Sequence, residues 1–262
     1  MNYKKKYSGH PFRKKWGQNF LTDTNLLEKI VKTIEPKVDD NFLEIGPGEG
    51  ALTDRIFPKV KNLVSVEIDP LLIKVLEQKP ALKGLKIVHG DILNQNIDAL
   101  PMNNPVRIFG NIPYNISSPL LNWCEKNFER INDMHFMLQK EFALRCAGNE
   151  YSSSYGRLSV ICNYLYEVTI LKDVPRDYFD PKPKVDSLFV RFTPKIKKIN
   201  HKELNSLKEI TRALFNKKRK KISNSLRDIM DDDNIDKLNL DLSLRPDHLS
   251  LEDYLKISAL LK

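Results

Sequence analysis

Short apolar stretches alternate with amphipathic segments along the first half of this chain, and the alternation predicts an α/β fold. The segment at 51–57 has the spacing of a helix, and Thr22 or Asp23 can cap a helix that ends at Ile34. Strands that alternate with helices in this way are typical of a doubly wound, largely parallel sheet. Four stretches have the length and composition of buried strands: 41–45, 63–67, 85–90 and 106–110.

The apolar pattern becomes less regular after Gln139. A polar loop at 148–156 comes before a long apolar stretch at 161–170, which has the composition of a strand. A proline-containing segment at 179–184 then leads into a last predicted strand at 185–192. Because proline cannot donate a hydrogen bond inside a central strand, we expect the segment before that last strand to be a rigid surface loop.

The C-terminal part of the chain has a different composition. A lysine-rich stretch at 195–198 has the character of a linker, and from Leu204 onward the apolar residues have helical spacing without strand-like runs. We therefore predict two domains: an α/β domain at 1–194, which includes a basic arm at 1–20, and a small helical domain at 195–262.

Polar residues come directly after each predicted strand. A glycine turn at 46–50 follows the first strand, Glu67 ends the second, Asp91 follows the third and Asn111 follows the fourth. Ligands of open α/β sheets bind beside the carboxyl ends of the strands, so these groups are expected to face one crevice. The turn and Glu67 have the spacing of a nucleotide site with a ribose-binding carboxylate, as in dehydrogenases. Asp91 can accept from an adenine amino group, as at one end of S-adenosylmethionine, and the four polar strand ends in order favour a methyltransferase over a hydride-transfer enzyme.

The stretch from Asn111 to Tyr114 has the chemistry of a pocket for an amino group on a flat ring. The amine of adenine is a poor nucleophile because its lone pair is delocalised into the ring. The Asn111 side-chain carbonyl and the Ile112 backbone carbonyl can accept its two hydrogens. Pro113 stiffens the turn, and Tyr114 offers a face on which a base can stack. The alternative is an ordinary turn with Tyr114 in the core, against which the other polar strand ends argue.

The chain has a net charge of +9, and basic clusters lie near both of its ends. Lys14 and Lys15 belong to an N-terminal arm that has no acidic residue before Asp23. Each cluster alone also fits a solvated surface, but two clusters that flank a predicted base-modifying pocket favour a nucleic acid partner. The second cluster consists of Lys217, Lys218, Arg219, Lys220 and Lys221.

The remaining composition narrows the class of protein. The chain has 262 residues, 41% of them hydrophobic, which is enough for one large core or for one large and one small core. It has no apolar run of membrane length and no secretory signal, so we expect a cytoplasmic protein without a membrane contact. Its 3 cysteines and 5 histidines lack metal-ligand spacing, so we expect reduced thiols and no metal site. We further expect a monomer.

Motifs spread over nearly the whole chain resemble, in the same order, those of a known family. They are GQNFL at 17–21, LEIGPGEG at 43–50, VEID at 66–69, GD at 90–91, GNIPYNISSP at 110–119, YGRLS at 155–159, PKPKVDS at 181–187 and FNKKRK at 215–220. The family is that of the small-subunit (16S) ribosomal RNA adenine dimethyltransferases of the KsgA type. The resemblance implies a Rossmann-like class I S-adenosylmethionine-dependent methyltransferase fold with a small all-α C-terminal domain. It also implies dimethylation of the N6 amines of two adjacent adenosines near the 3′ end of 16S rRNA, with a role in small-subunit biogenesis.

The resemblance further implies how single residues hold the cofactor. Asn19 and Leu21 close over it, and we expect Asn19 to act through its backbone because relatives often carry histidine at this place. Gly46 approaches the methionine part of the cofactor. Glu67 binds its ribose and Asp91 its adenine.

For the target base, the resemblance implies that Asn111 orients the amine beside the cofactor, while Tyr114 and Phe179 sandwich the ring. Phe179 also fits a core residue beneath the proline-containing loop. Two rival functions stay open. One is a related enzyme that dimethylates large-subunit rRNA, against which the family-like motif from Phe215 argues. The other is a ribosome assembly factor without catalysis, against which the intact Asn111 and Tyr114 argue.

Overall fold

The computed structural model describes residues 18–196 and 198–261, and the chain forms two compact units. The first unit comprises the described residues up to Lys140 together with Ile170–Phe192. The second comprises Glu141–Thr169 and the described residues from Thr193 onward. The break after Phe192 lies close to the boundary predicted at 194. In contrast to that predicted division, residues 141–169 group with the C-terminal helices.

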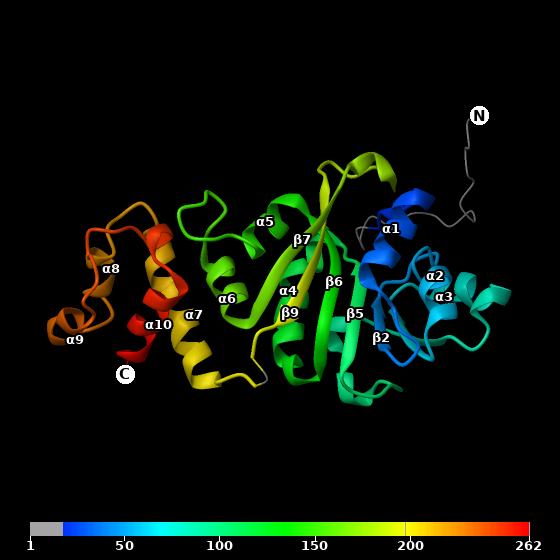
Figure 1. The fold of residues 1–262 in the computed structure, drawn as a ribbon, viewed down its shortest axis with the longest axis horizontal. Helices are drawn as coiled ribbons and strands as arrows, with labels where there is room; N and C mark the ends of the chain where they lie inside the picture. Colours follow the sequence, from blue (N-terminus) through cyan, green and yellow to red (C-terminus); the bar gives the residue numbers. More distant parts are fainter. Residues whose placement is uncertain (1–17, 197, 262) are drawn as a thin grey trace. The chain divides into compact units, whose positions relative to one another are not determined.

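The main sheet has seven strands in the order β4-β3-β2-β5-β6-β9-β7 (Figure 1). β2 pairs in parallel with both β3 and β5, β3 with β4, and β5 with β6, while β9 runs antiparallel to β6. The α/β fold predicted from the sequence is therefore confirmed. The strands are β2 (Asn41–Ile45), β3 (Asn62–Glu67), β4 (Lys86–His89), β5 (Val106–Asn111), β6 (Ile131–Gln139), β7 (Tyr166–Val174) and β9 (Ser187–Pro194).

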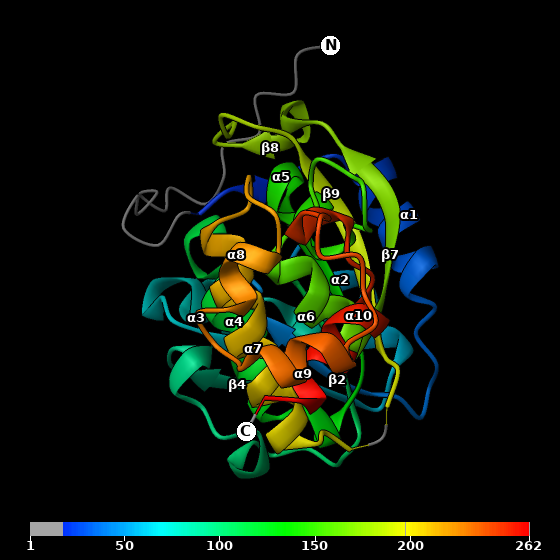
Figure 2. The same cartoon turned by 90° about the vertical axis from the view of Figure 1, so that its left-hand side faces the viewer.

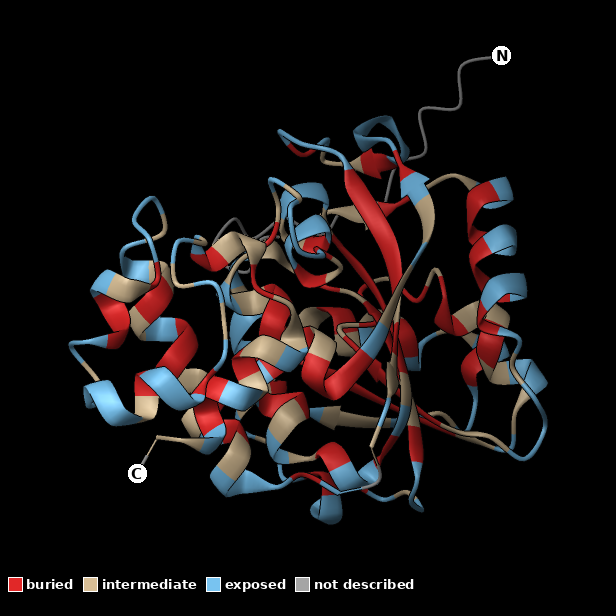
Figure 3. Ribbon diagram, turned by 60° about the vertical axis from the view of Figure 1, so that its left-hand side comes forward, coloured by how far each residue is buried: buried red, intermediate tan, exposed pale blue. Residues whose placement is uncertain are grey.

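Helix α1 (Thr24–Ile34) begins and ends where the sequence predicts. The Asp23 carboxylate accepts a hydrogen bond from the Leu26 amide at 2.7 Å, so Asp23 rather than Thr22 caps the helix. One side of α1 is buried and the other is exposed, as the burial colours of Figure 3 show. The other helices of the first unit are α2 (Thr53–Ile56), α3 (Pro70–Glu77) and α4 (Ser117–Lys126).

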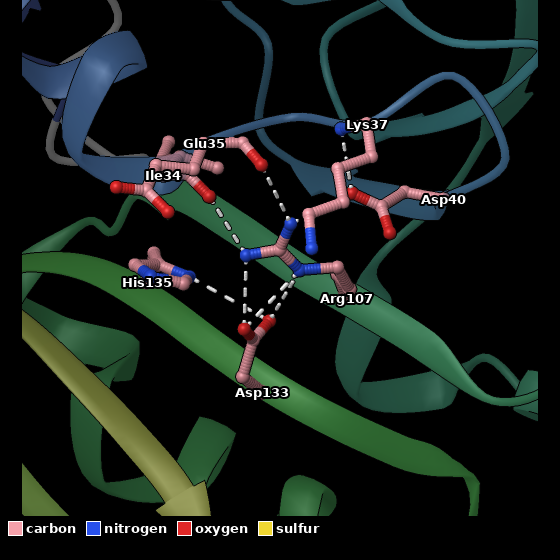
Figure 4. A network of polar contacts seen from close by, with 7 residues as sticks. All are labelled: Ile34, Glu35, Lys37, Asp40, Arg107, Asp133 and His135. Carbon is pink, nitrogen blue, oxygen red and sulfur yellow. Dashed lines mark hydrogen bonds and ion pairs between the residues drawn. The ribbon is translucent and has the colours of Figure 1, made fainter.

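Arg107 on β5 fastens the end of α1 to the sheet (Figure 4). Its Nη2 donates to the Ile34 carbonyl at 2.8 Å, and its Nη1 donates to the Glu35 carbonyl at 3.2 Å. The other donors bind the Asp40 carboxylate at 2.7 Å and both Asp133 oxygens at 3.0 to 3.1 Å. All the N–H donors of the guanidinium therefore have acceptors, and the last carbonyls of the helix are capped.

The second unit is largely helical. Helix α7 (His201–Asn216) packs against both α6 (Arg157–Leu165) and α10 (Leu251–Ala259), as Figure 2 shows. The further helices from Lys140 onward are α5 (Lys140–Cys146), α8 (Ser223–Leu226) and α9 (Asp232–Lys237). Among the helices of the described residues, none is long and apolar enough to cross a membrane.

The prediction of a strand across 161–170 is wrong for its first half. Helix α6 extends to Leu165, and the strand β7 begins only at Tyr166. The β-branched and aromatic residues of this stretch suit a strand by local preference. In the fold, α6 buries Val160, Cys162 and Leu165 and packs against α7. Tertiary packing therefore overrides the local preference, and it also explains why this segment groups with the C-terminal helices.

A second, two-stranded sheet joins β1 (Phe20–Leu21) to β8 (Phe179–Asp180) in antiparallel order. Phe179 lies opposite Leu21 and is buried. The proline-containing segment therefore begins with a short buried strand, whereas the sequence predicts a surface loop throughout. Two strands of two residues each leave no periodicity by which sequence alone can find them.

Candidate active site

The order of the strands reverses at β2, since β3 and β4 continue on one side of it and β5 and β6 on the other. Open α/β sheets bind ligands at such a reversal, outside the carboxyl ends of the strands. A cavity of about 220 Å³ lies at this place, bordered by the ends of β2 and β5. The predicted site residues in its lining are Asn19, Gly46, Glu67, Asp91, Asn111, Ile112, Pro113 and Tyr114.

The glycine turn after β2 brings backbone, without side chains, to the wall of this cavity. Gly46 has φ 64° and Gly48 has φ 59°, values that favour glycine. A Cβ at Gly46 would meet no atom of the described residues within 4 Å beyond its chain neighbours, so there is room beside it for a ligand. A Cβ at Gly48 would lie 2.6 Å from the Phe20 ring, so only glycine fits between the turn and the N-terminal segment.

Glu67, the last residue of β3, lines the cavity with a side chain that is 4% exposed. Its Oε1 accepts from the Asp69 amide at 2.9 Å and its Oε2 from the Gly48 amide at 3.1 Å. Burial raises the pKa of Glu67, and these backbone hydrogen bonds oppose the rise. Each carboxylate oxygen keeps a lone pair, so a pair of ribose hydroxyls can donate to it.

Asp91 comes directly after β4 and lines the same cavity. Its Oδ1 accepts from the Leu93 amide at 3.0 Å, which fixes the carboxylate at the start of the 3₁₀ turn Ile92–Asn94. The buried side chain of Ile92 lies in the cavity wall beside it. An apolar side chain next to a carboxylate suits a flat ring that carries an amino group.

The orientation of the Asn111 amide is fixed by the N-terminal segment. Its Nδ2 donates to the Asn19 backbone carbonyl at 2.6 Å. That carbonyl can only accept, so the reverse orientation would place two oxygens against each other. The Asn111 Oδ1 receives no hydrogen bond from the residues the structure describes, and it is the group that can accept from a substrate amine. Asn19 contributes its backbone carbonyl to this contact, and its expected contact with the cofactor stays a prediction.

The two residues that complete this motif are held by the strands behind them. The Ile112 amide donates to the Met137 carbonyl of β6 at 3.2 Å, and the Ile112 side chain is buried. The Tyr114 phenol lies 2.8 Å from the Ser187 hydroxyl at the start of β9. Sequence reasoning did not single out Ser187, which lies within the PKPKVDS motif and shows its partner only in the fold.

Phe179 and Leu21 lie away from the lining of the first cavity. Phe179 is buried in the core of the first unit, in a cluster that also contains Leu21 and Leu27. Its role as a second stacking partner for the target base therefore stays a prediction. Leu21 borders a neighbouring cavity of about 190 Å³, which shares Gly46 and Asn111 with the first.

The predicted RNA-binding residues fall into three groups. Lys14 and Lys15 lie outside the described residues. Lys217 pairs with Asp228 at 2.6 Å, and Lys218 donates to the Tyr155 carbonyl at 3.0 Å, so both ammonium groups have partners within the protein. Lys217 is exposed as well as paired, and the other exposed residues of this cluster are Arg219, Lys220 and Lys221.

Known proteins resemble this chain over almost its whole length. Residues 9–262 match the family model described as ribosomal RNA adenine dimethylase. The ribosomal RNA small subunit methyltransferase A of Shewanella oneidensis is 40% identical, and the match covers 97% of this chain and 96% of the relative. The protein of the same name from Shewanella pealeana is 39% identical with the same coverage.

Solved structures give a second, independent comparison. A dimethyladenosine transferase from Plasmodium falciparum is 27% identical with a TM-score of 0.76, over 91% of this chain and 95% of that chain. The 23S rRNA methyltransferase ErmE is 28% identical with a TM-score of 0.73, over 92% of this chain and 99% of that chain. Together with the full-length match to the family model, these likenesses show that the chain belongs to the ribosomal RNA adenine dimethylase family and is a methyltransferase.

Proposed function

We propose that this enzyme dimethylates the N6 amines of two adjacent adenosines near the 3′ end of 16S rRNA, in the small ribosomal subunit or its precursor. The observation that carries the proposal is the Asn111 amide, which lies in the cavity wall and whose N–H is bound to the Asn19 carbonyl, so that its own carbonyl is left to accept from a substrate. The choice of the small subunit follows the curated relatives at 39 to 40% identity, which are named small subunit methyltransferases. The large-subunit alternative is represented by ErmE at only 28% identity.

S-adenosylmethionine is the methyl donor in this proposal, and when bound it supplies an electrophilic methyl group. The cavity fits it at several points. Gly46 leaves space beside the backbone, Glu67 can accept from two ribose hydroxyls, and Asp91 can accept from an adenine amine. The absence of a Cβ at Gly46 and the lone pairs left on Glu67 are the features of this chain that favour such a ligand.

The target adenine is prepared by the motif at the end of β5. The carbonyls of Asn111 and Ile112 accept the two amine hydrogens, which returns lone-pair density to the nitrogen. The Tyr114 ring, held by Ser187, gives the base a face to stack on. Extrusion of a base costs a few kcal/mol, and stacking returns roughly 1–3 kcal/mol of it. Proximity and orientation supply most of the rate enhancement, so no strong general base is required.

The second unit contributes to RNA docking in this proposal through its exposed cations, Arg219, Lys220 and Lys221. An assembly factor without catalysis would need the cations but not the fixed Asn111 amide, and this favours the enzyme. An added role in small-subunit biogenesis, a cytoplasmic location and a monomeric state remain predictions.

The test is methylation of small subunits purified from cells that lack this gene. The wild-type protein with S-adenosylmethionine should add two methyl groups to each of two adjacent adenosines, as measured by mass spectrometry of the 3′ fragment of 16S rRNA. Asn111→Ala is the matched control and should leave the fragment unmodified. Methylation of 23S rRNA instead, or no change in the 16S fragment, would contradict the proposal.

A further inference from the structure

Tyr151 combines high exposure with a strained backbone. Its side chain is 70% exposed, more than any other large hydrophobic side chain in the described part of the chain. Its φ is 64°, in the left-handed region that a bulky residue rarely occupies. Its amide donates to the Asp247 carbonyl at 2.9 Å, which holds the residue in this conformation. A ring kept outside the core by a strained and hydrogen-bonded backbone points to a functional reason.

One face of the Tyr151 ring is already covered. The imidazole of His248 stacks on it, with ring centroids 4.9 Å apart and an interplanar angle of 22°. Since the side chain is nonetheless 70% exposed, the other face is open to solvent. The pair therefore presents a flat aromatic surface of fixed orientation.

Two buried tyrosines form hydrogen bonds to the segment that carries His248. The phenol of Tyr155 donates to the Leu249 carbonyl at 3.0 Å, and the phenol of Tyr254 donates to the Pro246 carbonyl at 2.7 Å. Both tyrosines are fully buried. The carbonyls of Pro246 and Leu249, on the two sides of His248, are thus bound by core side chains, which restrains the backbone that carries the imidazole.

Residues of both charges lie on the segments that carry this aromatic surface. Lys218 connects the basic cluster to the residues around His248, since its Nζ donates to the Tyr155 carbonyl at 3.0 Å and lies 3.8 Å from the Asp247 carboxylate. The exposed cations of the adjoining segments include Arg157, Arg219 and Arg245, close in sequence to Tyr155, Lys218 and Pro246, and the acidic residues next to the two rings are Glu150 and Asp247. An open aromatic face with cations on the adjoining segments is an arrangement that binds single-stranded nucleic acid.

We propose that Tyr151, backed by His248, is a stacking platform for one unpaired base of RNA whose flanking phosphates meet cations of the adjoining segments. A base inside a duplex offers no free face, so the occupant is an unpaired or terminal nucleotide. The identity of that RNA as ribosomal rests on the proposed function, whereas the platform chemistry does not.

The test compares two variants of Tyr151 in the full-length protein. Tyr151→Asn removes the ring at a position where asparagine tolerates the left-handed backbone, and Tyr151→Phe keeps the ring. The probe is the small ribosomal subunit that lacks the dimethylation, with affinity measured at several salt concentrations. We expect Tyr151→Asn to bind at least about fivefold more weakly and Tyr151→Phe to bind as the wild type does. Arg219→Ala is the charge control and should reduce the salt dependence, which Tyr151→Asn should leave unchanged.

The outcomes separate this proposal from the proposed function. If the wild type methylates small subunits but Tyr151→Asn binds them equally well, or Tyr151→Phe binds as weakly as Tyr151→Asn, the platform is wrong and the enzyme assignment stands. If the wild type neither binds nor methylates small subunits, the proposed function fails. The platform then still requires that Tyr151→Asn bind an unpaired RNA oligonucleotide more weakly than the wild type and Tyr151→Phe do. A loss of affinity for subunits but not for protein-free 16S rRNA would assign Tyr151 to a protein contact and overturn the platform.

Discussion

The phenol of Tyr114 lies 2.8 Å from the hydroxyl of Ser187, and this hydrogen bond holds the outer end of the ring in place in the cavity wall. Ser187 is fully buried and pairs with Gln139 across β6 and β9, so it is a rigid anchor. Burial raises the pKa of the Tyr114 phenol, and the group therefore stays neutral around neutral pH. The hydroxyl is engaged by the protein, which leaves the face of the ring for the substrate.

Variants of Tyr114 and Ser187 should separate the contribution of the ring face to the methylation rate from the contribution of the hydroxyl. Tyr114→Phe loses one neutral hydrogen bond, worth about 0.5–1.5 kcal/mol, so single-turnover methylation should slow by roughly tenfold or less. Tyr114→Ala also loses stacking worth roughly 1–3 kcal/mol and should be much slower. Ser187→Ala removes the same hydrogen bond from the other side, so the double variant with Tyr114→Phe should be no slower than the slower single variant. A Tyr114→Phe enzyme as slow as Tyr114→Ala would give the hydroxyl a direct role.

Glu67 should govern cofactor affinity without affecting RNA affinity. Hydrogen bonds to a charged acceptor are worth about 1.5–3 kcal/mol, so Glu67→Ala should weaken S-adenosylmethionine binding by about tenfold or more in calorimetry. The alanine also removes the acceptor for the amides of Gly48 and Asp69. Glu67→Gln keeps one acceptor oxygen and should fall between the wild type and Glu67→Ala. Unchanged cofactor affinity in Glu67→Ala would remove this residue from the binding site.

The positions of the polar strand ends were predictable from sequence because sheet geometry dictates them. Parallel strands deliver whatever follows them to one edge, so Glu67, Asp91 and Asn111 had to meet once the strands were identified. The structure brings all three to one cavity. The same reasoning cannot find hydrogen-bond partners that are distant in the sequence, such as Asn19 for Asn111 or Ser187 for Tyr114.

Other features were missed because their cause lies in tertiary packing. The pairing of β8 with β1, which accompanies the burial of Phe179, joins strands too short to leave a pattern, although a core position was one of the two sequence interpretations of Phe179. The Arg107 network had one signal, a charged residue inside an otherwise apolar strand. Burial of such a residue requires acceptors, but sequence does not say which carboxylates and carbonyls supply them.

Arg107 should be far more important for stability than an exposed arginine of similar pairing. Its side chain is 12% exposed and serves both Asp40 and Asp133, as well as the end of α1. Removal of one partner from a buried ionic network costs about 3–5 kcal/mol, so Arg107→Ala should lower the free energy of unfolding in urea by roughly 3 kcal/mol. Arg107→Lys should restore only part of this, because lysine lacks the planar fork.

The matched control for Arg107 is Arg130, which pairs with Asp98 at 3.0 Å but is 48% exposed. Exposed ion pairs contribute about 0–1 kcal/mol, so Arg130→Ala should be nearly neutral in the same urea experiment. Equal losses for the two arginines would mean that the Arg107 network does not hold α1 to the sheet in the way its hydrogen bonds indicate.

Glu44 on β2 gives the protein a pH-dependent stability. Its side chain is 2% exposed, and its Oε2 accepts from the hydroxyls of Thr53 at 2.7 Å and Ser65 at 3.1 Å. Burial raises the pKa of Glu44 from 4.5 to about 8 in spite of these hydrogen bonds, so the folded protein holds a proton near neutral pH. The unfolded chain releases that proton near pH 4.5.

Between these two pKa values the folded state binds more protons than the unfolded state, so the contribution of Glu44 to the free energy of unfolding falls as pH rises. The slope is about 1.4 kcal/mol for each pH unit, and the loss is complete above a pH of about 8. Glu44→Gln resembles the protonated acid, still accepts from Thr53 and Ser65, and cannot titrate. We therefore expect the stability of Glu44→Gln relative to the wild type to increase steadily in urea unfolding from pH 5 to about pH 8. A difference that stays constant across this range would show that Glu44 is already ionised in the folded protein.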